Sequence, residues 1–357
     1  MSKFLLLIDE MGQGGAERQI SYLAMGLKKA GHEVRLIKFY DGHNYYGKDL
    51  ENAGVVTETF LDGQSGLKRV GVIRKLVRDW KPDLTKCYTE GTCTAACLAR
   101  LSGLRNFRFV VSERNTTQRL TFKERLRFWL YRAATAIVPN SYSQEKFIRE
   151  NFPGLSGKVK VITNMVDTVK FSPAEHKPQN DILQVITTAR VAPQKNALTY
   201  VDGVAELKKR GVKVHLNWFG NPYPDYFEKV KARIAELDIA DMVTFNKGTD
   251  DVVTAYRNAD IFLLPSLYEG FPNVLCEAMA CGLPAIATAV CDSPVILTDE
   301  RWHVDPHSPQ SFADAIERMV SLSPEQRAEI GRSNRQRIVD LCSENKFIEN
   351  NINLLNI

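Results

Sequence analysis

Two acidic residues flank the start of a short predicted helix in an otherwise apolar part of the chain. Glu269 lies in a polar turn after a buried strand, and Glu277 lies in the second turn of the helix that follows. Pro272 suits the first turn of that helix, and Gly282 suits its end. Free backbone amides at a helix start favour an anion, and the two carboxylates favour hydroxyl groups. The pattern therefore predicts a site for a phosphorylated sugar.

Two cations follow the expected first strand of the second half. The strand ends in Thr187-Thr188-Ala189-Arg190, and Lys195-Asn196 opens the next helix, with Asn196 as its expected cap. A doubly wound sheet binds phosphates here, where Arg190 can hold two oxygens as a fork and Lys195 acts as a point charge. The alternative is that both are solvated surface bases. Because the sequence contains no Asp-x-Asp motif, the two cations would replace a metal ion at a nucleotide diphosphate.

A glycine-rich loop follows the first strand of the chain. Gly14 and Gly15 let the backbone approach a ligand, and the helix that begins there favours phosphate. The NAD-binding fingerprint requires glycine where Glu17 stands, so the loop disfavours a dinucleotide site. A tight turn without a ligand is the alternative.

The elements that must position these residues are short apolar runs that alternate with helical patterns. Such alternation predicts parallel sheets with helices on both faces, and the polar stretch 172–181 is typical of a linker. We expect two doubly wound α/β domains, 1–175 and 182–339, with a cleft between them and a C-terminal helix, 340–357, that packs back on the first. The expected strands lie at 3–8, 33–39, 84–88, 107–111, 136–139 and 159–162, and then at 182–187, 212–219, 242–245, 261–264 and 284–289.

Length and composition agree with two globular domains. A chain of 357 residues is too long for one ordinary core. It contains no apolar run of about 18 residues that could span a membrane, and its N-terminus is typical of a first strand and not of a signal peptide. Seven cysteines without Cys-x-x-Cys spacing predict reduced core thiols and a cytoplasmic location.

Charge is distributed unevenly along the chain. Residues 1–180 contain 29 Lys and Arg against 18 Asp and Glu, whereas residues 181–357 contain 18 against 24. The difference suggests separate partners for the two halves. A nucleic-acid partner is disfavoured, because the combined basic and aromatic pattern is confined to one short helix.

That helix lies within the basic segment 119–132. Its periodicity places Phe122, Leu126, Trp129 and Leu130 on one stripe, which we expect to face the core. The remaining basic and apolar side chains suit an anionic membrane surface, although a solvated core helix is the alternative. The membrane-contact candidates are Lys123, Arg125, Arg127, Phe128 and Tyr131.

The order of these motifs resembles a known family. Gly14-Gly15-Ala16-Glu17-Arg18 is followed by Arg190 and Lys195, then by Pro265-Ser266, Glu269, Glu277-Ala-Met-Ala-Cys-Gly282 and Pro284. Over nearly the whole chain they resemble glycosyltransferase family 4. The resemblance implies the GT-B fold, in which two Rossmann-like domains face each other across a cleft. It also implies a retaining enzyme that needs neither a metal nor a cofactor.

The resemblance carries roles to the matching positions. Arg190 and Lys195 would stabilise the leaving diphosphate, Glu277 would bind the donor ribose, and Glu269 would bind the transferred sugar. The first-domain loop would close over the phosphates. The catalytic candidates are Arg190, Lys195 and Glu269, and the other donor-binding candidates are Gly14, Gly15, Lys247, Gly248, Gly270, Phe271, Asn273, Val274 and Glu277, with Lys247 and Gly248 bordering the nucleobase.

Two positions depart from the family pattern. Many relatives carry a histidine where this chain reads Ser112-Glu113-Arg114-Asn115, so we treat Glu113, Arg114 and Asn115 as candidates near the acceptor. This form resembles members that build bacterial surface polysaccharides, often from N-acetylhexosamine donors. After Val290, Cys291-Asp292-Ser293-Pro294 replaces a common glycine-rich turn.

The expected function is transfer of a sugar from a UDP-linked donor to a glycan or a polyprenyl-diphosphate-linked saccharide, at the inner face of the cytoplasmic membrane. A sugar-nucleotide epimerase or hydrolase of the same fold is the first alternative, and it would release or rearrange the sugar without an acceptor. A non-catalytic nucleotide-sugar-binding protein is the second, and it would show no turnover.

Overall fold

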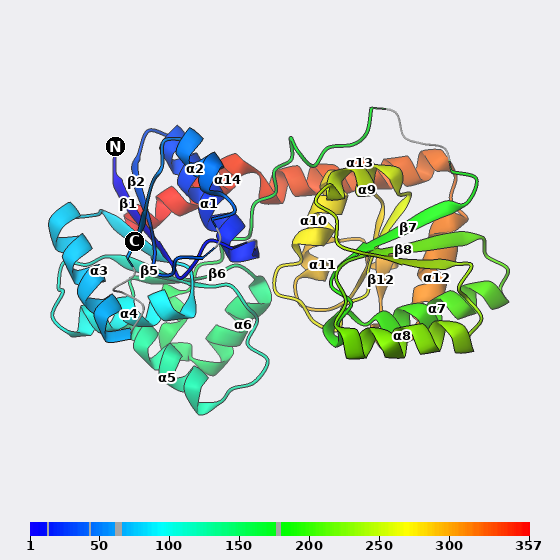
Figure 1. Cartoon of the computed structure of the whole chain (residues 1–357), viewed down its shortest axis with the longest axis horizontal. Coiled ribbons are helices and arrows are strands. Elements are labelled where there is room, and N and C mark those ends of the chain that lie inside the picture. Colours follow the sequence, from blue (N-terminus) through cyan, green and yellow to red (C-terminus); the bar gives the residue numbers. More distant parts are fainter. Residues whose placement is uncertain (13, 43, 61–65, 176–179) are drawn as a thin grey trace. The chain divides into compact units, whose positions relative to one another are not determined.

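The computed structural model describes the whole chain except residues 13, 43, 61–65 and 176–179. It contains two compact units (Figure 1). The first unit combines Met1–Met165 with the C-terminal Glu344–Ile357, and the second is Val166–Ser343. Part of the expected linker lies outside the described residues.

The first unit is built on a parallel sheet in the order β3-β2-β1-β4-β5-β6. Successive side chains of its central strand point to opposite faces: Leu5 and Leu7 join one apolar cluster, and Phe4, Leu6 and Ile8 join the other. The strands are β1 (Lys3–Ile8), β2 (Glu33–Lys38), β3 (Val56–Thr59), β4 (Leu84–Cys87), β5 (Phe109–Glu113) and β6 (Ala136–Pro139).

Helices cover both faces of this sheet. One cluster contains residues of α3, α4, α5 and α6, and the other contains residues of α1, α2 and the C-terminal α14. Figure 1 shows α14 beside α1, where Gly26 lets Ile348 approach the helix backbone. The helices are α1 (Gly15–Lys29), α2 (Gly47–Asn52), α3 (Gly66–Trp80), α4 (Glu90–Leu101), α5 (Phe122–Leu130), α6 (Tyr142–Asn151) and α14 (Glu344–Ile352).

The second unit repeats the design with a parallel sheet in the order β12-β11-β10-β7-β8-β9. Its strands are β7 (Leu183–Thr188), β8 (Val214–Phe219), β9 (Val243–Asn246), β10 (Ile261–Leu264), β11 (Ala285–Thr288) and β12 (His303–Val304). Its helices are α7 (Ala197–Lys209), α8 (Pro224–Glu236), α9 (Val252–Asn258), α10 (Asn273–Ala280), α11 (Ser293–Ile296), α12 (Pro309–Val320) and α13 (Pro324–Cys342).

The predicted fold class, two Rossmann-like α/β units with parallel sheets, is confirmed. Two edge strands were not predicted: β3 is half-exposed and polar, and β12 has only two residues. The expected strand at 159–162 is wrong, because Val159 forms only an isolated bridge with Ile137. No helix in the described part of the chain is long and apolar enough to cross a membrane.

Each sheet has one point where the strand order reverses. In the first unit β1 lies between β2 and β4, and in the second unit β7 lies between β8 and β10. Crevices at the carboxyl ends of strands at such points are the usual ligand sites of open α/β sheets. The two reversals therefore mark where ligand-binding side chains are expected.

Candidate active site

The second-unit reversal brings two predicted catalytic residues together. Lys195 lies in the turn after β7, and Glu269 lies in the loop after β10. The Lys195 Nζ is 2.5 Å from the Glu269 Oε1, and their side chains are 16% and 9% exposed. The hydroxyl of Ser266 donates to the same oxygen at 2.5 Å. The carboxylate is thus held in one orientation at the crevice between β7 and β10.

Hydrogen bonds tie these two loops to each other. The Leu267 amide donates to the Gln194 carbonyl at 2.8 Å, and the Gln194 side chain donates to the Tyr268 carbonyl at 2.9 Å. Asn196 has a left-handed backbone, with φ of 61°, and its side-chain amide donates to the carbonyls of Pro265 and Pro306. Asn196 therefore occupies the cap position of α7 as predicted, but its side chain holds the β10 loop instead of capping the helix.

Arg190 follows β7 directly and is positioned by Tyr223. Its Nη1 donates to the Tyr223 hydroxyl at 2.8 Å, and its guanidinium lies 5.4 Å from the centre of the Tyr223 ring. Gly220, at the end of β8, supports the same turn, because an added Cβ would lie 1.8 Å from the Ala189 carbonyl oxygen. Gly220 and Tyr223 were not predicted from the sequence. A glycine at the end of an apolar strand, followed by Pro222, was the available signal.

Lys247 and Gly248 follow β9 and are exposed. The Gly248 amide donates to the Asn221 side-chain oxygen at 3.2 Å, and the Gly220 amide donates to the Asn246 carbonyl at 3.1 Å. These bonds join the ends of β8 and β9, so both predicted nucleobase residues lie at the carboxyl edge of the same sheet.

Helix α10 presents its start to this edge. The Leu275 and Cys276 amides donate to the Pro272 carbonyl, at 3.1 and 3.4 Å, so the helix begins directly after Pro272. Phe271 is buried, and Gly270, Asn273 and Val274 are half-buried. Glu277 is buried in the second turn of α10. The predicted C-terminal stop is confirmed, because Gly282 has a φ of +77°.

Cys291 contacts the same loop. The Glu269 amide donates to the Cys291 sulfur at 3.4 Å, and Cys291 has a left-handed φ of 49°. This conformation favours glycine, in keeping with the glycine-rich turn that the family resemblance leads us to expect after Val290. All seven cysteines are free thiols, and all except Cys291 are buried.

In the first unit, the glycine loop lies at the end of β1. Gly14 is the residue before α1, with extended backbone angles, and Gly15 is the first residue of the helix. A Cβ on Gly14 would meet the Glu17 carboxylate, the flexible end of a side chain. The structure thus places both glycines at the carboxyl edge of the first sheet.

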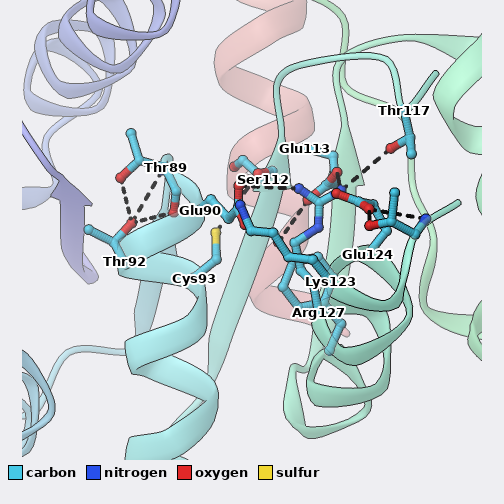
Figure 2. Close-up of polar contacts among 12 residues, drawn as sticks. Thr89, Glu90, Thr92, Cys93, Ser112, Glu113, Thr117, Lys123, Glu124 and Arg127 are labelled. Atoms are coloured by element: carbon cyan, nitrogen blue, oxygen red, sulfur yellow. Dashed lines mark hydrogen bonds and ion pairs between the residues drawn. The ribbon is translucent and has the colours of Figure 1, made fainter. Parts of the chain in front are cut away.

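Glu113 lies inside the first unit and not at an open site. Its carboxylate accepts from the Tyr131 hydroxyl at 2.7 Å and from the Gln144 amide at 3.3 Å, and it pairs with Arg127 at 3.4 Å. Burial raises the pKa of Glu113, and Arg127 and Tyr131 offset part of the rise. Figure 2 shows this carboxylate facing α5. The Glu113 side chain therefore anchors α5, and its assignment as an acceptor candidate is corrected.

The other two residues of that motif are closer to the surface. Arg114 is partly buried, its guanidinium lies 5.2 Å from the centre of the Tyr88 ring, and it donates to the Asn164 side chain at 2.6 Å. Asn115 is exposed. Both remain candidates near the acceptor.

The membrane face predicted for α5 is reversed. Phe128 and Tyr131 are fully buried, whereas Phe122, Leu126 and Trp129 are 80%, 47% and 53% exposed. The buried side is decided by the stacking of Phe128 on Phe152, with ring centres 4.4 Å apart, and not by the larger number of apolar residues on the other stripe. Helical periodicity alone could not reveal that contact.

The basic candidates on α5 divide in the same way. Arg127 is mostly buried and pairs with Glu113 and Glu90, at 3.4 and 3.7 Å, so it is wrong as a membrane contact together with Phe128 and Tyr131. Lys123 and Arg125 are exposed. Lys123 also lies 2.9 Å from Glu90 at the start of α4 (Figure 2).

Known sequences and structures show which family the chain resembles. The family profile described as "Glycosyltransferase Family 4" matches residues 13–170, and "Glycosyl transferases group 1" matches residues 168–337. The chain is 24% identical, over 90% of its length and 91% of the relative, to the amylovoran biosynthesis glycosyltransferase AmsD of Erwinia amylovora. A putative colanic acid biosynthesis glycosyltransferase of Escherichia coli is 26% identical over 51% of this chain, which spans about half of that relative.

A Campylobacter jejuni enzyme is 26% identical over 78% of this chain and 77% of its own length. Its name is GalNAc-alpha-(1->4)-GalNAc-alpha-(1->3)-diNAcBac-PP-undecaprenol alpha-1,4-N-acetyl-D-galactosaminyltransferase.

Two solved structures have the same fold. A glycosyltransferase from Rickettsia africae aligns with a TM-score of 0.87 and 18% identity over 99% of this chain and 98% of its own. Anabaena HepE, in complex with UDP and glucose, aligns with a TM-score of 0.83 and 18% identity over the full length of both chains. The paired sheets, the motif order and the two adjoining family profiles lead to one conclusion: the chain belongs to glycosyltransferase family 4 and has the GT-B fold.

Proposed function

We propose that this glycosyltransferase moves a sugar, an N-acetylhexosamine, from a UDP-linked donor to a lipid-linked saccharide in bacterial polysaccharide synthesis, with retention of anomeric configuration. The observation that carries the proposal is the Lys195–Glu269 pair at the reversal between β7 and β10. An ammonium group suits the diphosphate and a carboxylate suits sugar hydroxyls, so the pair defines adjacent halves of a sugar-nucleotide site.

The remaining residues of the second unit complete the donor site. Arg190, held by Tyr223, and Lys195 bind the diphosphate oxygens, to which the electron pair of the broken glycosidic bond moves. Charge that develops on these oxygens is stabilised by groups already in place. Two fixed cations supply that stabilisation without a metal ion. The carboxylate of Glu277 binds the ribose, and the loop after β9 borders the base.

The names of relatives support the choice of substrates. The Campylobacter jejuni enzyme is named for N-acetylgalactosamine transfer and for an undecaprenol-linked saccharide, and HepE was solved with UDP. The partly buried Arg114 and the exposed Asn115 lie at the end of β5 in the first unit, where we place part of the acceptor site.

A panel of UDP-, GDP- and ADP-sugars tests the donor assignment. We expect UDP-N-acetylhexosamines to raise the Tm most, and product NMR with a lipid-linked acceptor to show the anomeric configuration of the donor. Sugar released or rearranged without an acceptor would identify the epimerase or hydrolase alternative. Binding without turnover would identify a non-catalytic nucleotide-sugar-binding protein.

The exposed face of α5 supports a membrane-bound acceptor. Phe122, Leu126 and Trp129 expose apolar surface next to the exposed bases Lys123 and Arg125. Aromatic side chains suit the bilayer interface, and each base near an anionic surface contributes on the order of 1 kcal/mol. We place this face on the inner leaflet of the cytoplasmic membrane.

Flotation with anionic vesicles tests this placement. Phe122→Ser with Trp129→Ser should abolish flotation, whereas Leu67→Ser, which removes an exposed leucine from α3, should not. Equal flotation of all variants would refute the membrane face.

A further inference from the structure

The first-unit reversal contains a pocket that is separate from the residues assigned to the donor. It has a volume of about 460 Å³, within the range of about 300–1,000 Å³ typical of small-molecule sites. The side chains that line it include those of Tyr40, Arg69, Glu90, Thr94 and Leu98. They come from the end of β2 and from α3 and α4, so the pocket opens at the carboxyl ends of the central strands.

One wall of the pocket is a fixed guanidinium. Arg69 is 5% exposed, and its Nη1 donates to the Asp9 carboxylate at 2.6 Å. Its guanidinium lies 4.7 Å from the centre of the Phe39 ring and 5.5 Å from that of Tyr40. Because an ion pair and two aromatic rings hold it, Arg69 presents its N–H donors in one fixed orientation. Donors that are fixed in this way suit hydrogen bonds to a polar ligand in the pocket.

The start of α4 leaves room for this pair. A Cβ on Gly91 would lie 2.3 Å from the Arg69 Nη1 and 3.1 Å from both carboxylate oxygens of Asp9. Any side chain at this position would therefore displace the pair from the wall. Gly91 also lines the pocket, so the absence of a side chain there preserves both the Arg69–Asp9 pair and the space of the pocket.

The pocket is also connected to the proposed membrane face. Glu90 lines it and pairs with Lys123 and Arg127 of α5, at 2.9 and 3.7 Å. Figure 2 shows these bases between Glu90 and Glu113. A ligand bound here would contact a carboxylate whose partners belong to the helix that carries the exposed apolar stripe.

We propose that this pocket binds the terminal saccharide of the acceptor. Tyr40 and Leu98 are each more than one-third exposed and offer apolar surface to the C–H face of a pyranose ring. Arg69, Glu90 and Thr94 offer donors and acceptors to its hydroxyls. A diphosphate is disfavoured, because Asp9 already pairs with the guanidinium and Glu90 adds a further carboxylate to the lining.

The position suits transfer. Asp9, the ion-pair partner of the pocket residue Arg69, follows the same strand end as the Gly14–Gly15 loop that we assign to the donor phosphates. The inference rests on the proposed function for the identity of the ligand, but the pocket can be tested without the donor.

Filling the pocket provides the test. Leu98→Trp places an indole in it, and Leu101→Trp makes the same change at another exposed position of α4 that does not line it. Binding of p-nitrophenyl glycosides of N-acetylglucosamine, N-acetylgalactosamine, glucose and galactose is measured by saturation-transfer NMR. We expect wild type and Leu101→Trp to bind at least one glycoside, and Leu98→Trp to bind it about tenfold more weakly or not at all, the loss expected for about 1.4 kcal/mol of contacts.

Thr94→Val keeps the side-chain shape and removes only the hydroxyl, so it tests the pocket if the tryptophan variant does not fold. We expect weaker binding for Thr94→Val as well. No glycoside bound by wild type, equal binding by Leu98→Trp and Thr94→Val, or equal loss in Leu101→Trp would overturn the proposal. The Tm shift by UDP-sugars in the same variants reports the second unit separately, so failure of the donor assignment is distinguishable from failure of the pocket.

Discussion

The two sheet reversals have the same topology and opposite charge arrangements. In the second unit, the cation Lys195 follows the first strand and the acid Glu269 follows the fourth. In the first unit, the acid Asp9 follows the first strand, its cation Arg69 comes from α3, and a second acid, Glu90, follows the fourth. Fold topology therefore fixes where a ligand binds, and the side chains at that place decide which ligand.

The different charges at the two reversals suit different ligands, an anion in the second unit and a hydroxyl-rich molecule in the first. The second unit adds Arg190 to Lys195 and so offers two cations at one strand end, which suits a diphosphate. The first unit offers one guanidinium already paired with a carboxylate, which suits a neutral, hydroxyl-rich ligand. Variants at equivalent places in the two units should therefore affect different substrates.

Loss of Lys195 should have the largest effect. Lys195→Ala removes a preorganised cation from the diphosphate, so we expect kcat/KM to fall by about 100- to 1,000-fold. The same substitution at Lys209, an exposed lysine of α7 paired with Glu206, should leave kcat/KM unchanged. Steady-state kinetics with both variants checks the prediction. Near-normal transfer by Lys195→Ala would contradict the assignment of Lys195 to the donor diphosphate.

The second-unit site was more predictable from the sequence than the first-unit pocket for a physical reason. Glu269, Pro272 and Glu277 lie within one strand–turn–helix segment, so local spacing already places them near the same edge of the sheet. The residues that line the pocket come from three places in the sequence, the end of β2, α3 and α4. Arg69 in particular lies on an amphipathic helix, where a base is normally a solvated residue, and only the tertiary fold buries it against Asp9.

The same reasoning explains the error on α5. Its pattern contains two apolar stripes, and local periodicity does not indicate which of them meets Phe152. The parallel sheets were predictable because strands buried on both faces are continuous apolar runs, whereas the polar edge strand β3 and the two-residue β12 lack that signal.

Gly220 in the second unit and Gly91 in the first offer the next comparison. Replacement of Gly220 by alanine should lower stability more than replacement of Gly91. A Cβ on Gly220 would meet backbone, 1.8 Å from the Ala189 carbonyl oxygen, so the turn that carries Arg190 must move. We expect Gly220→Ala to lower the free energy of unfolding by about 1–3 kcal/mol and to weaken UDP-sugar binding. Urea unfolding and calorimetric titration measure both effects. An unchanged donor affinity would show that this turn does not position Arg190.

Gly91→Ala should be milder for stability and selective for the acceptor. The nearest atom to its Cβ is the Arg69 Nη1, the end of a side chain that can move, although the Asp9 pair is then disturbed. We expect a smaller loss of stability than for Gly220→Ala, a higher KM for the acceptor and an unchanged KM for the donor. Gly71→Ala, on α3 with open space around its Cβ, is the matched control. A raised donor KM would contradict the division of labour between the two reversals.

Substitution of Glu113 should have the smallest effect, a change in how the free energy of unfolding depends on pH. Burial raises the pKa of Glu113 in the folded chain above that of an unfolded glutamate, which is about 4.3. At pH values between these two pKa values, the native state binds more protons than the unfolded state. The contribution of Glu113 to the free energy of unfolding therefore falls as pH rises through this window. Wild type should lose stability relative to Glu113→Gln over the window, measured by urea unfolding at several pH values.

Glu124 supplies a control of opposite sign on the same helix. The Thr121 hydroxyl donates to its carboxylate at the start of α5 and lowers its pKa. Its contribution is present above the unfolded pKa and is lost as pH falls, so wild type should gain stability relative to Glu124→Gln as pH rises. Parallel slopes for the two variants would show that Glu113 is not held by burial. Opposite slopes would show that α5 is anchored inside the first unit by a carboxylate that is costly to charge, and capped at its exposed start by one that is not.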